Sequence, residues 1–238
     1  MGARIASLAL ADSVYTIAAA IEARGHQTVG QDVGTLLGVK PLGVRVTDDA
    51  AAALQSGDVL IEFTRPEPTL EHLQLARRLK KPMVIGTTGL SEAQLHDLRE
   101  AAKDIPIVFS PNMSLGVNLL FRLVQDAAAC LGPEYDVAIT EAHHRGKQDA
   151  PSGTAKRLLD VMATKRPASA KPVEVQSIRA GDIVGDHTVI FAGPAERLEL
   201  THRAHSRDAF ATGALKAAQF VRAQKPGLYD MSHVLQRA

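Results

Sequence analysis

The sequence is poor in the residue types that mark several classes of protein. Its 238 residues include one cysteine, Cys130, no tryptophan, and only 4% aromatic residues. A single thiol excludes an internal disulfide and a cysteine-rich zinc cluster. The chain shows no block of basic residues and no interleaving of basic with aromatic residues, so nucleic-acid binding is not indicated. The composition therefore points away from disulfide scaffolds, zinc fingers and polyanion-binding proteins.

Long apolar runs and an excess of either charge are also lacking. Lys and Arg number 27 against 26 Asp and Glu, which gives a formal net charge of +1. No apolar stretch approaches the roughly 18 residues of a membrane span. The first ten residues do not show the basic region, apolar core and cleavage site of a secretion signal. With 45% hydrophobic residues, we expect a cytoplasmic protein with one or two cores and neither a membrane nor a nucleic-acid partner.

Short apolar runs alternate with helical patterns over the first 110 residues. This alternation is typical of a parallel sheet covered by helices. The predicted strands cover residues 14–21, 43–47, 58–63, 82–86 and 105–110. Helical spacing is clear over 70–79 and 95–102, and Ser91 with Gln94 has the sequence of a capping box. These features predict an α/β fold.

The pattern changes after residue 113. Ser114 opens a predicted helix of about 17 residues, and a polar loop then separates a strand from a second helix. The elements predicted after the first helix are a strand over 135–142, a helix over 155–162, a connector over 166–172, strands over 173–180, 187–193 and 196–204, and a helix over 210–221. The three late strands indicate a small mixed or antiparallel sheet, and the chain is expected to end in an irregular tail. We therefore predict two domains with a boundary near residue 113.

Reactive side chains are densest in the loop EAHHRGKQDAPSGTA, residues 141–155. A solvated polar loop is one interpretation of such a cluster. Pro151 and Ser152, however, are typical of a helix start, which would place the N–H groups of Gly153 and Thr154 at the positive end of a helix dipole. Such a position binds anions. Imidazoles and an ammonium group beside it suit a carboxylate substrate that is protonated near neutral pH.

This loop resembles the signature of the 4-hydroxy-tetrahydrodipicolinate reductase (dihydrodipicolinate reductase) family, nicotinamide-dependent enzymes of diaminopimelate and lysine biosynthesis. The similarity extends in family order over residues 58–72, 84–89, 110–118, 179–193, 196–215 and 227–231. It implies reduction of 4-hydroxy-tetrahydrodipicolinate to tetrahydrodipicolinate. By position in the motif, it implies that His143 donates and accepts a proton, that Lys147 donates a proton, and that His144, Gly153 and Thr154 bind the small dicarboxylate substrate.

Cofactor-binding residues are expected at the carboxyl ends of the early strands, where open α/β sheets bind nucleotides. This placement and the resemblance together predict which residues bind NADH or NADPH. They are Glu22, Phe63, Thr64, Gly86, Thr87, Thr88, Ser110, Pro111, Asn112 and Met113. A simple glycine turn would fit the segment around Gly86 equally well. Family members that use NADPH well have an arginine directly after the acidic residue that corresponds to Glu22. In this sequence Ala23 follows Glu22, and Arg24 is one residue further on. The preference between the two cofactors stays open.

The resemblance also implies the organisation of the molecule. A Rossmann-like, parallel-sheet nucleotide domain would comprise residues 1–113 and 207–238. An α+β domain with a mixed sheet, residues 114–206, would bind substrate and form a homotetramer. The sequence begins Met1-Gly2-Ala3, and Gly2 aligns with the last glycine of the family's phosphate loop. We therefore expect the nucleotide domain to lack its first strand, to be loosened and to bind cofactor weakly. A start assigned too far downstream and a shortened polypeptide are the two explanations considered.

Two alternatives stand beside an active reductase. The chain could be a cofactor-impaired homologue retained as a binding or assembly module. A serine hydrolase using Ser152 is disfavoured because no G-x-S-x-G elbow surrounds that residue. The histidines, aspartates and glutamates do not show metal-ligand spacing, so we expect no catalytic metal. His26, His72 and His96 are expected to face solvent, and His202 and His205 receive no role.

Overall fold

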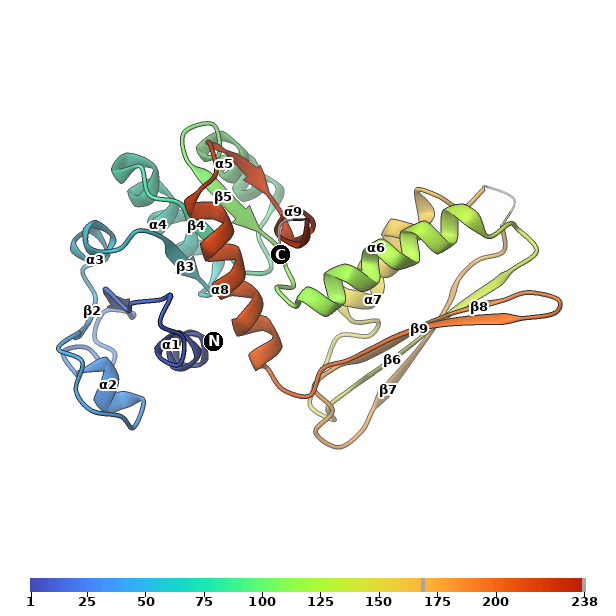
Figure 1. The fold of residues 1–238 in the computed structure, drawn as a ribbon, viewed down its shortest axis with the longest axis horizontal. Helices are drawn as coiled ribbons and strands as arrows, with labels where there is room; N and C mark the ends of the chain where they lie inside the picture. Colours follow the sequence, from blue (N-terminus) through green and yellow to red (C-terminus); the bar gives the residue numbers. More distant parts are fainter. Residues whose placement is uncertain (168–169, 237–238) are drawn as a thin grey trace. The chain divides into compact units, whose positions relative to one another are not determined.

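The computed structural model describes residues 1–167 and 170–236, and the chain forms two compact units (Figure 1). The first unit comprises residues 1–113 and the chain from Phe210 onward, and the second comprises Ser114–Ala209. The first unit is therefore built from both ends of the chain. The second is one continuous insertion between them.

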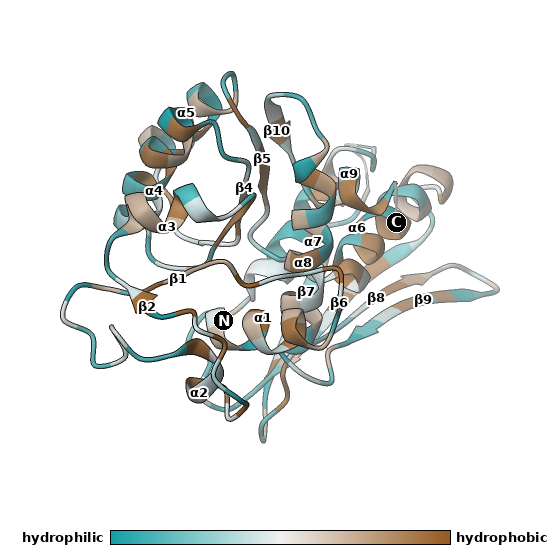
Figure 2. Cartoon of the chain, turned by 60° about the vertical axis from the view of Figure 1, so that its left-hand side comes forward, coloured by the Kyte–Doolittle hydropathy of each residue, from teal (hydrophilic) through white to brown (hydrophobic). Residues whose placement is uncertain are grey.

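A four-stranded parallel sheet forms the centre of the first unit. Its strands, in spatial order, are β10 (Gly227–Tyr229), β5 (Pro106–Phe109), β4 (Met83–Ile85) and β3 (Leu60–Glu62). Helices α4 (Pro66–Leu79) and α5 (Glu92–Ala101) cover one side and α8 (Asp208–Arg222) the other (Figures 1 and 2). All three residues of β4 are fully buried, as expected for a central parallel strand with both faces covered.

The predicted helices on this sheet pack through the residues that the helical spacing selected. Leu73 and Ala76 of α4 and Leu98 of α5 lie in one core with Met83 and Ile85 of the sheet. The predicted capping box is confirmed: the Gln94 N–H donates to Ser91 Oγ at 3.3 Å, and the Ser91 N–H donates to Gln94 Oε1 at 2.9 Å. Periodicity and capping thus specify these helices locally.

A second, separate sheet of the first unit has only two parallel strands, β1 (Ala20–Ile21) and β2 (Val46–Thr47). Helices α1 (Gly2–Leu10), α2 (Val33–Leu36) and α3 (Ala50–Ser56) belong to the same part of the chain. The prediction of a strand over 14–21 is wrong for residues 14–19, because only the last two residues of the run find backbone partners in β2. Within the described residues, β1 pairs only with β2 and β3 only with β4, so each has one open edge.

The expected irregular tail is a second error. After α8 the chain forms β10, in which Leu228 pairs with Ile107 of β5, and then helix α9 (Met231–Leu235). Asp230 caps α9 by accepting hydrogen bonds from the N–H groups of Ser232 and His233. A three-residue strand has too few positions to show a period of two, so its pairing with a distant strand is invisible to sequence periodicity.

The second unit is a mixed four-stranded sheet with helices on one face. Its strands, in spatial order, are β7 (Glu174–Arg179), β6 (Asp136–His143), β8 (Asp186–Ala192) and β9 (Arg197–Arg203). Strand β7 runs parallel to β6, and the other pairs are antiparallel. Helices α6 (Leu115–Cys130) and α7 (Gly153–Ala163) pack against buried Ile139, Val189 and Phe191 (Figure 1). Of the predicted connector 166–172, residues 168 and 169 lie outside the described residues.

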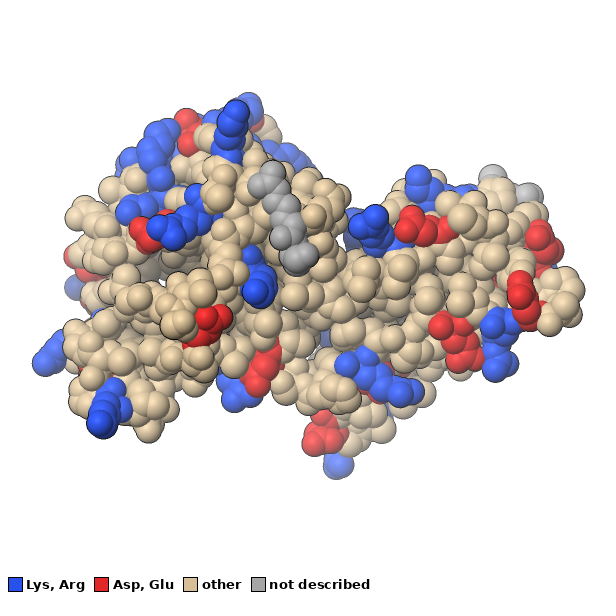
Figure 3. All heavy atoms as spheres, in the orientation of Figure 1, with Lys and Arg blue, Asp and Glu red and all other residues tan. Residues whose placement is uncertain are grey.

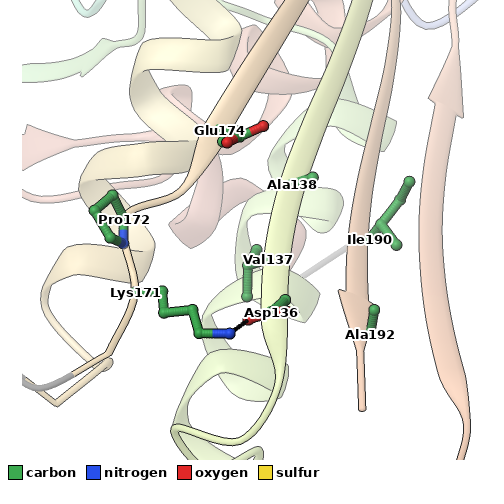
Figure 4. Close-up of a pocket in the computed structure, with 8 residues that line it drawn as sticks. All are labelled: Asp136, Val137, Ala138, Lys171, Pro172, Glu174, Ile190 and Ala192. Atoms are coloured by element: carbon green, nitrogen blue, oxygen red, sulfur yellow. Dashed lines mark ion pairs between the residues drawn. The ribbon is translucent and has the colours of Figure 1, made fainter. Parts of the chain in front are cut away.

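The face of this sheet opposite α6 and α7 is mixed in character. It carries small, polar and branched side chains, among them Thr140, Thr188 and Ile190, which alternate with the buried residues. At one end lies a pocket of about 490 Å³, beside which Lys171 Nζ contacts Asp136 Oδ1 at 2.7 Å (Figure 4). This pocket lies at the Asp136 end of β6, whereas the reactive loop follows its other end.

Charges of both signs are interspersed over the molecular face shown in Figure 3. This matches the near balance of basic and acidic residues in the sequence. Among the described residues, every helix is too short or too polar to cross a membrane.

Candidate active site

The register of the second sheet gathers charged residues at the carboxyl end of β6. Glu141 and His143 are two residues apart on β6, so their side chains point to the same face. His143 is paired with Arg179 of β7, and Glu141 is paired with His187 of β8. Four ionisable side chains from three strands therefore lie together on the helix-covered face.

Glu141 is the centre of this cluster. Its side chain is fully buried, and its Oε2 lies 2.5 Å from Nδ1 of His143. Arg179 donates to both carboxylate oxygens, to Oε1 at 2.8 Å and to Oε2 at 3.0 Å. Burial alone would raise the pKa of Glu141, but hydrogen bonds from Arg179, Ser177 and His143 outweigh it and lower that pKa to about 2. Glu141 is thus an anion at any pH at which the protein is expected to work.

The charge of Glu141 decides the proton position on His143. An ionised carboxylate accepts hydrogen bonds only, so Nδ1 of the neutral imidazole carries the hydrogen and Nε2 carries the lone pair. Burial lowers the pKa of His143; Glu141 opposes this shift, while the positive charges of Lys147 and Arg179 add to it. Nε2 faces Gly185, where an added Cβ would lie 3.1 Å from it. The missing side chain at Gly185 leaves room beside the reactive nitrogen.

The second half of the loop after β6 is held in place by the same pair, Arg179 and Glu141. Arg179 donates to the Asp149 carbonyl oxygen at 2.6 Å, and the Ser152 N–H donates to Glu141 Oε1 at 3.3 Å. Ser152 also caps α7 through the N–H of Ala155, as predicted. Lys147 contacts Asp149 at 2.7 Å between Nζ and Oδ1. The loop that contains Lys147 is therefore fixed to the strands that carry His143 and Arg179.

The remaining predicted substrate residues lie at the same end of the sheet. His144 is half-buried directly after β6, and Gly153 and Thr154 are the first two residues of α7. Gly153 is exposed and Thr154 half-buried. His143, His144, Lys147 and the start of α7 thus belong to one chain segment, which Glu141 anchors through the N–H of Ser152.

His187 belongs to this site although sequence analysis assigned it no role. It is almost fully buried, its Nε2 lies 3.1 Å from Ser152 Oγ, and its ring packs edge-on against His143 at 5.1 Å between centroids. Burial, and then the neighbouring His143, lower the pKa of His187 to about 4. The available signal was its alternation with Val189 and Phe191, which places all three on the inner face.

Glu141, His143 and His187 also have ligand-type atoms within 4.8 Å of one another. Spacing along the sequence does not reveal this set, because its residues come from two strands, β6 and β8, that are far apart in the chain. Both oxygens of Glu141 already accept hydrogen bonds from Arg179. A cation at this position would have to displace a guanidinium group, so we interpret the cluster as a carboxylate–imidazole–guanidinium group.

The predicted cofactor residues follow four parallel strands of the first unit. Glu22 follows β1, Phe63 and Thr64 follow β3, residues 86–88 follow β4, and residues 110–113 follow β5. The last three strands are neighbours in one parallel sheet, so their carboxyl ends share one edge. The topology therefore puts Phe63 and Thr64, Gly86 to Thr88, and Ser110 to Met113 side by side.

Contacts at this edge link two of the three turns. An added Cβ on Gly86 would lie 2.3 Å from the Phe63 ring, so glycine is required for this close approach. The buried Thr69 Oγ1 lies 2.8 Å from Thr87 Oγ1 and 3.3 Å from Thr64 Oγ1. A chain of hydroxyl groups therefore fixes the turn after β3 to the turn after β4.

Other predicted cofactor residues differ in exposure. Thr88 and Pro111 are exposed, Asn112 is half-buried and Met113 is buried. Ser110 Oγ donates to the Asn112 carbonyl oxygen at 2.8 Å, which closes the turn after β5. Glu22 is exposed, and its Oε1 accepts from the Ala23 N–H at 2.8 Å. Most of the residues that follow β4 and β5 are thus small, with Phe63 and Met113 as the large apolar side chains at this edge.

Comparison with known proteins decides the family. The N-terminal domain model of dihydrodipicolinate reductase matches residues 1–113, and the C-terminal domain model matches residues 116–235. The chain belongs to the dihydrodipicolinate reductase family. It is 44% identical over 252 residues to the 4-hydroxy-tetrahydrodipicolinate reductase of Syntrophus aciditrophicus (strain SB), covering 99% of this chain and 94% of that protein. For the enzyme of the same name from Nitrosomonas eutropha (strain DSM 101675 / C91 / Nm57), identity is 50% over 236 residues, with 92% and 88% covered.

Solved structures share the fold of this dihydrodipicolinate reductase family member. A dipicolinate-bound dihydrodipicolinate reductase from Paenisporosarcina sp. TG-14 superposes with a TM-score of 0.80 at 22% identity, covering 95% of this chain and 92% of that chain. An amine dehydrogenase from Mycobacterium smegmatis gives a TM-score of 0.66 at 17% identity, with 98% and 92% covered. The α/β architecture, a parallel-sheet Rossmann-like domain with a mixed-sheet domain, is thereby confirmed.

Among the histidines that were expected to face solvent, one does not. His26 and His96 are exposed as expected. His72 does not face solvent: its Nδ1 lies 2.5 Å from Oε2 of the buried Glu62, at the end of β3. A buried carboxylate needs a partner, and His72 of α4 supplies it. His202 is half-buried, with Nε2 3.4 Å from Ser114 Oγ.

Proposed function

We propose that this chain reduces 4-hydroxy-tetrahydrodipicolinate to tetrahydrodipicolinate with NADH or NADPH, in the cytoplasmic synthesis of diaminopimelate and lysine. The observation that carries the proposal is that Glu141 holds His143 at the end of β6, directly before a loop that leads to the N-terminus of α7. Relatives of 44–50% identity over nearly the whole chain are named for this reaction.

The reaction has a simple balance. A hydride and a proton enter, and the 4-hydroxyl group leaves as water. The nicotinamide, when bound, supplies the hydride. His143 would hold and deliver the proton at Nε2, and Lys147 would act as a second proton donor. Binding of a dianion beside His143 raises its pKa. Burial disfavours the protonated form of the His143 imidazole when no substrate is bound. Substrate binding would favour that protonated form again.

Substrate binding would use the residues around the start of α7. We assign one carboxylate to the N–H groups of Gly153 and Thr154 and the other polar contacts to His144 and Lys147. Lys147 contacts Asp149 in the structure, so a substrate carboxylate would compete with Asp149 for the ammonium group. The Paenisporosarcina reductase of the same fold binds dipicolinate. This supports a small planar dicarboxylate as the ligand class.

The cofactor would bind at the strand ends of the first unit, through Glu22, Phe63, Thr64, residues 86–88 and residues 110–113. Gly86 leaves the space in which a Cβ would meet Phe63. Glu22 can accept a ribose hydroxyl group of NADH, and the exposed Arg24 two residues on can contact the 2′-phosphate of NADPH. Both cofactors are therefore proposed, and titration with each measures the preference.

We also propose that the two domains have different roles and that the chain assembles with copies of itself. Residues 1–113 and 207–238 would bind the dinucleotide, and residues 114–206 would bind the substrate and form a homotetramer. The face of the β6–β9 sheet turned away from α6 and α7 supports the latter, because Thr140, Thr188 and Ile190 there are half-buried and uncharged and offer a surface that another copy can cover.

The direct test replaces His143 with glutamine. Turnover, measured by loss of nicotinamide absorbance, should fall by about 10²–10⁴ because a general acid is removed. The KM for the dicarboxylate should change much less. His96→Gln, an exposed histidine in α5, is the matched control and should retain full activity.

Two results would contradict this function. Near-normal turnover in His143→Gln would refute the role of that residue. A wild-type chain that neither enhances nicotinamide fluorescence nor turns over substrate would support the alternative, a cofactor-impaired homologue retained as a binding or assembly module.

A further inference from the structure

Resting on the proposed role of His143, we propose that Glu141 and Arg179 are positioning residues that fix the Nδ1–H tautomer of His143 and present its Nε2 to the substrate. Neither residue needs to contact the substrate. The inference is drawn from the sheet register and the hydrogen bonds at the carboxyl end of β6.

The first step is the geometry of Glu141. Its Oε2 lies 2.5 Å from His143 Nδ1, and its Oε1 accepts the Ser152 N–H. One carboxylate thus contacts the proton-carrying ring and the residue that caps the substrate-binding helix. A shift of Glu141 would move both groups at once. This is how a buried residue can act on a reaction without touching the reacting atoms.

The second step is the cost of burying the carboxylate. An ionised group without exposed surface needs a partner of opposite charge. Arg179 provides it with two hydrogen bonds, in the forked geometry that lysine cannot reproduce. Its contact with the Asp149 carbonyl oxygen extends the same anchor to the loop of Lys147. Arg179 therefore keeps Glu141 charged and keeps the loop in place.

The third step concerns the other groups that face His143. They are Glu141 on its own strand, Arg179 from β7, His187 from β8 and Lys147 from the loop. His187 is neutral near pH 7, with a pKa of about 4, whereas Lys147 and Arg179 are cationic. Glu141 is the one group in this set that favours the imidazolium form. Removing its charge should leave His143 harder to protonate.

The test compares Glu141→Gln, Glu141→Asp and Arg179→Lys with the wild type. Glu71→Gln, an exposed glutamate of α4, is the control for loss of one carboxylate. Spectra of ¹⁵N-histidine-labelled protein report the tautomer and pKa of His143 without substrate or cofactor. The His143 signals are assigned by their absence in His143→Gln.

We expect the wild type and Glu71→Gln to show the Nδ1–H tautomer. In Glu141→Gln the neutral ring should populate both tautomers, and its pKa should fall. Because a general acid must be protonated, the fall of kcat with rising pH should then begin at lower pH. The kcat at neutral pH should drop by roughly tenfold to a hundredfold with a smaller change in KM. Glu141→Asp should keep most of the wild-type preference for the Nδ1–H tautomer of His143, and Arg179→Lys should keep only part of it.

The outcomes separate the two proposals. An unchanged tautomer and an unchanged pH profile in folded Glu141→Gln would overturn the positioning role. A changed tautomer in Glu141→Gln, together with a wild-type protein that does not reduce the substrate, would uphold the positioning role and refute the proposed function. Thermal unfolding of each variant verifies that it is folded. Glu141→Asp keeps the comparison decisive if Glu141→Gln fails to fold.

Discussion

His187 shows how burial sets the charge of a single residue. Its side chain lies under α7, with Nε2 against Ser152 Oγ, and burial lowers its pKa to about 4. In the unfolded chain a histidine titrates near 6.5. Between these two values the unfolded state binds more protons than the folded state. Stability that depends on neutral His187 is therefore present above about pH 6.5 and is lost as the pH falls toward 4.

We predict that this loss can be measured. Linkage gives a contribution of about 2 kcal/mol lost on going from pH 7 to pH 5. Urea unfolding of the wild type and of His187→Asn over this range should show a steeper decline for the wild type. His96→Asn, an exposed position, should decline in parallel with the wild type. Equal slopes in wild type and His187→Asn would show that His187 is protonated in the folded protein at pH 5.

Which site residues the sequence could reveal depends on how far apart they lie. His143, His144 and Lys147 share one dense loop, so composition and the helix-start signal indicate them together. Arg179 and His187 reach the same point only through the register of β7 and β8 with β6. A single sequence does not contain that register, because strand pairing is a tertiary choice. Arg179 and His187 could therefore not be found from the sequence, whereas the residues of the loop 141–155 could.

At the scale of elements, α8 depends on a glycine contact with the turn after β5. A Cβ on Gly213 would lie 1.7 Å from the Met113 carbonyl oxygen. Met113 itself is buried, and its backbone cannot retreat without moving the turn that begins at Ser110. Helix propensity favours alanine over glycine by about 1 kcal/mol. The close approach thus opposes the local preference.

We predict that Gly213→Ala destabilises the protein by about 1–3 kcal/mol despite the better helix propensity, because the clash is with backbone. Chemical denaturation measures this change. Gly2→Ala in α1, where an added Cβ meets nothing within 4 Å, is the control and should be neutral or slightly stabilising. A stabilised Gly213→Ala variant would mean that α8 can shift away from Met113 at little cost.

The elements differ in how well the sequence predicted them. Helices α4, α5, α6 and α7 have both an apolar face and a capping residue or proline at the start, and these signals are local. The segment 14–19 is apolar but finds no strand to pair with among the described residues, and β10 is a strand because β5 offers an edge. Strands are decided by partners, whereas helices carry their own hydrogen bonds.

At the scale of the whole molecule, the first unit has unpaired strand edges and the second unit has a sheet face without covering helices. Within the described residues, β1 and β3 each keep one unpaired edge. The expectation of a loosened nucleotide domain with weak cofactor binding stays a prediction. The second unit instead presents a whole sheet face, on which Thr188 and Thr201 hydroxyl oxygens lie 3.0 Å apart. A sheet face can pair with a symmetric copy of itself through the same residues on both chains.

The last prediction follows from that face. Light scattering at micromolar concentration should report a homotetramer for the wild type. Thr188→Arg should yield a smaller species with an unchanged circular dichroism spectrum, because the interface would bury a guanidinium group without a partner of opposite charge. Ala129→Arg, at an exposed position of α6 on the other side of the sheet, should leave the tetramer intact. A stable wild-type monomer would contradict the assembly. A tetramer that tolerates Thr188→Arg but not Ala129→Arg would place the interface on the helices instead. An introduced arginine disrupts assembly only where another copy covers it, and in that case the covered position would be Ala129 of α6.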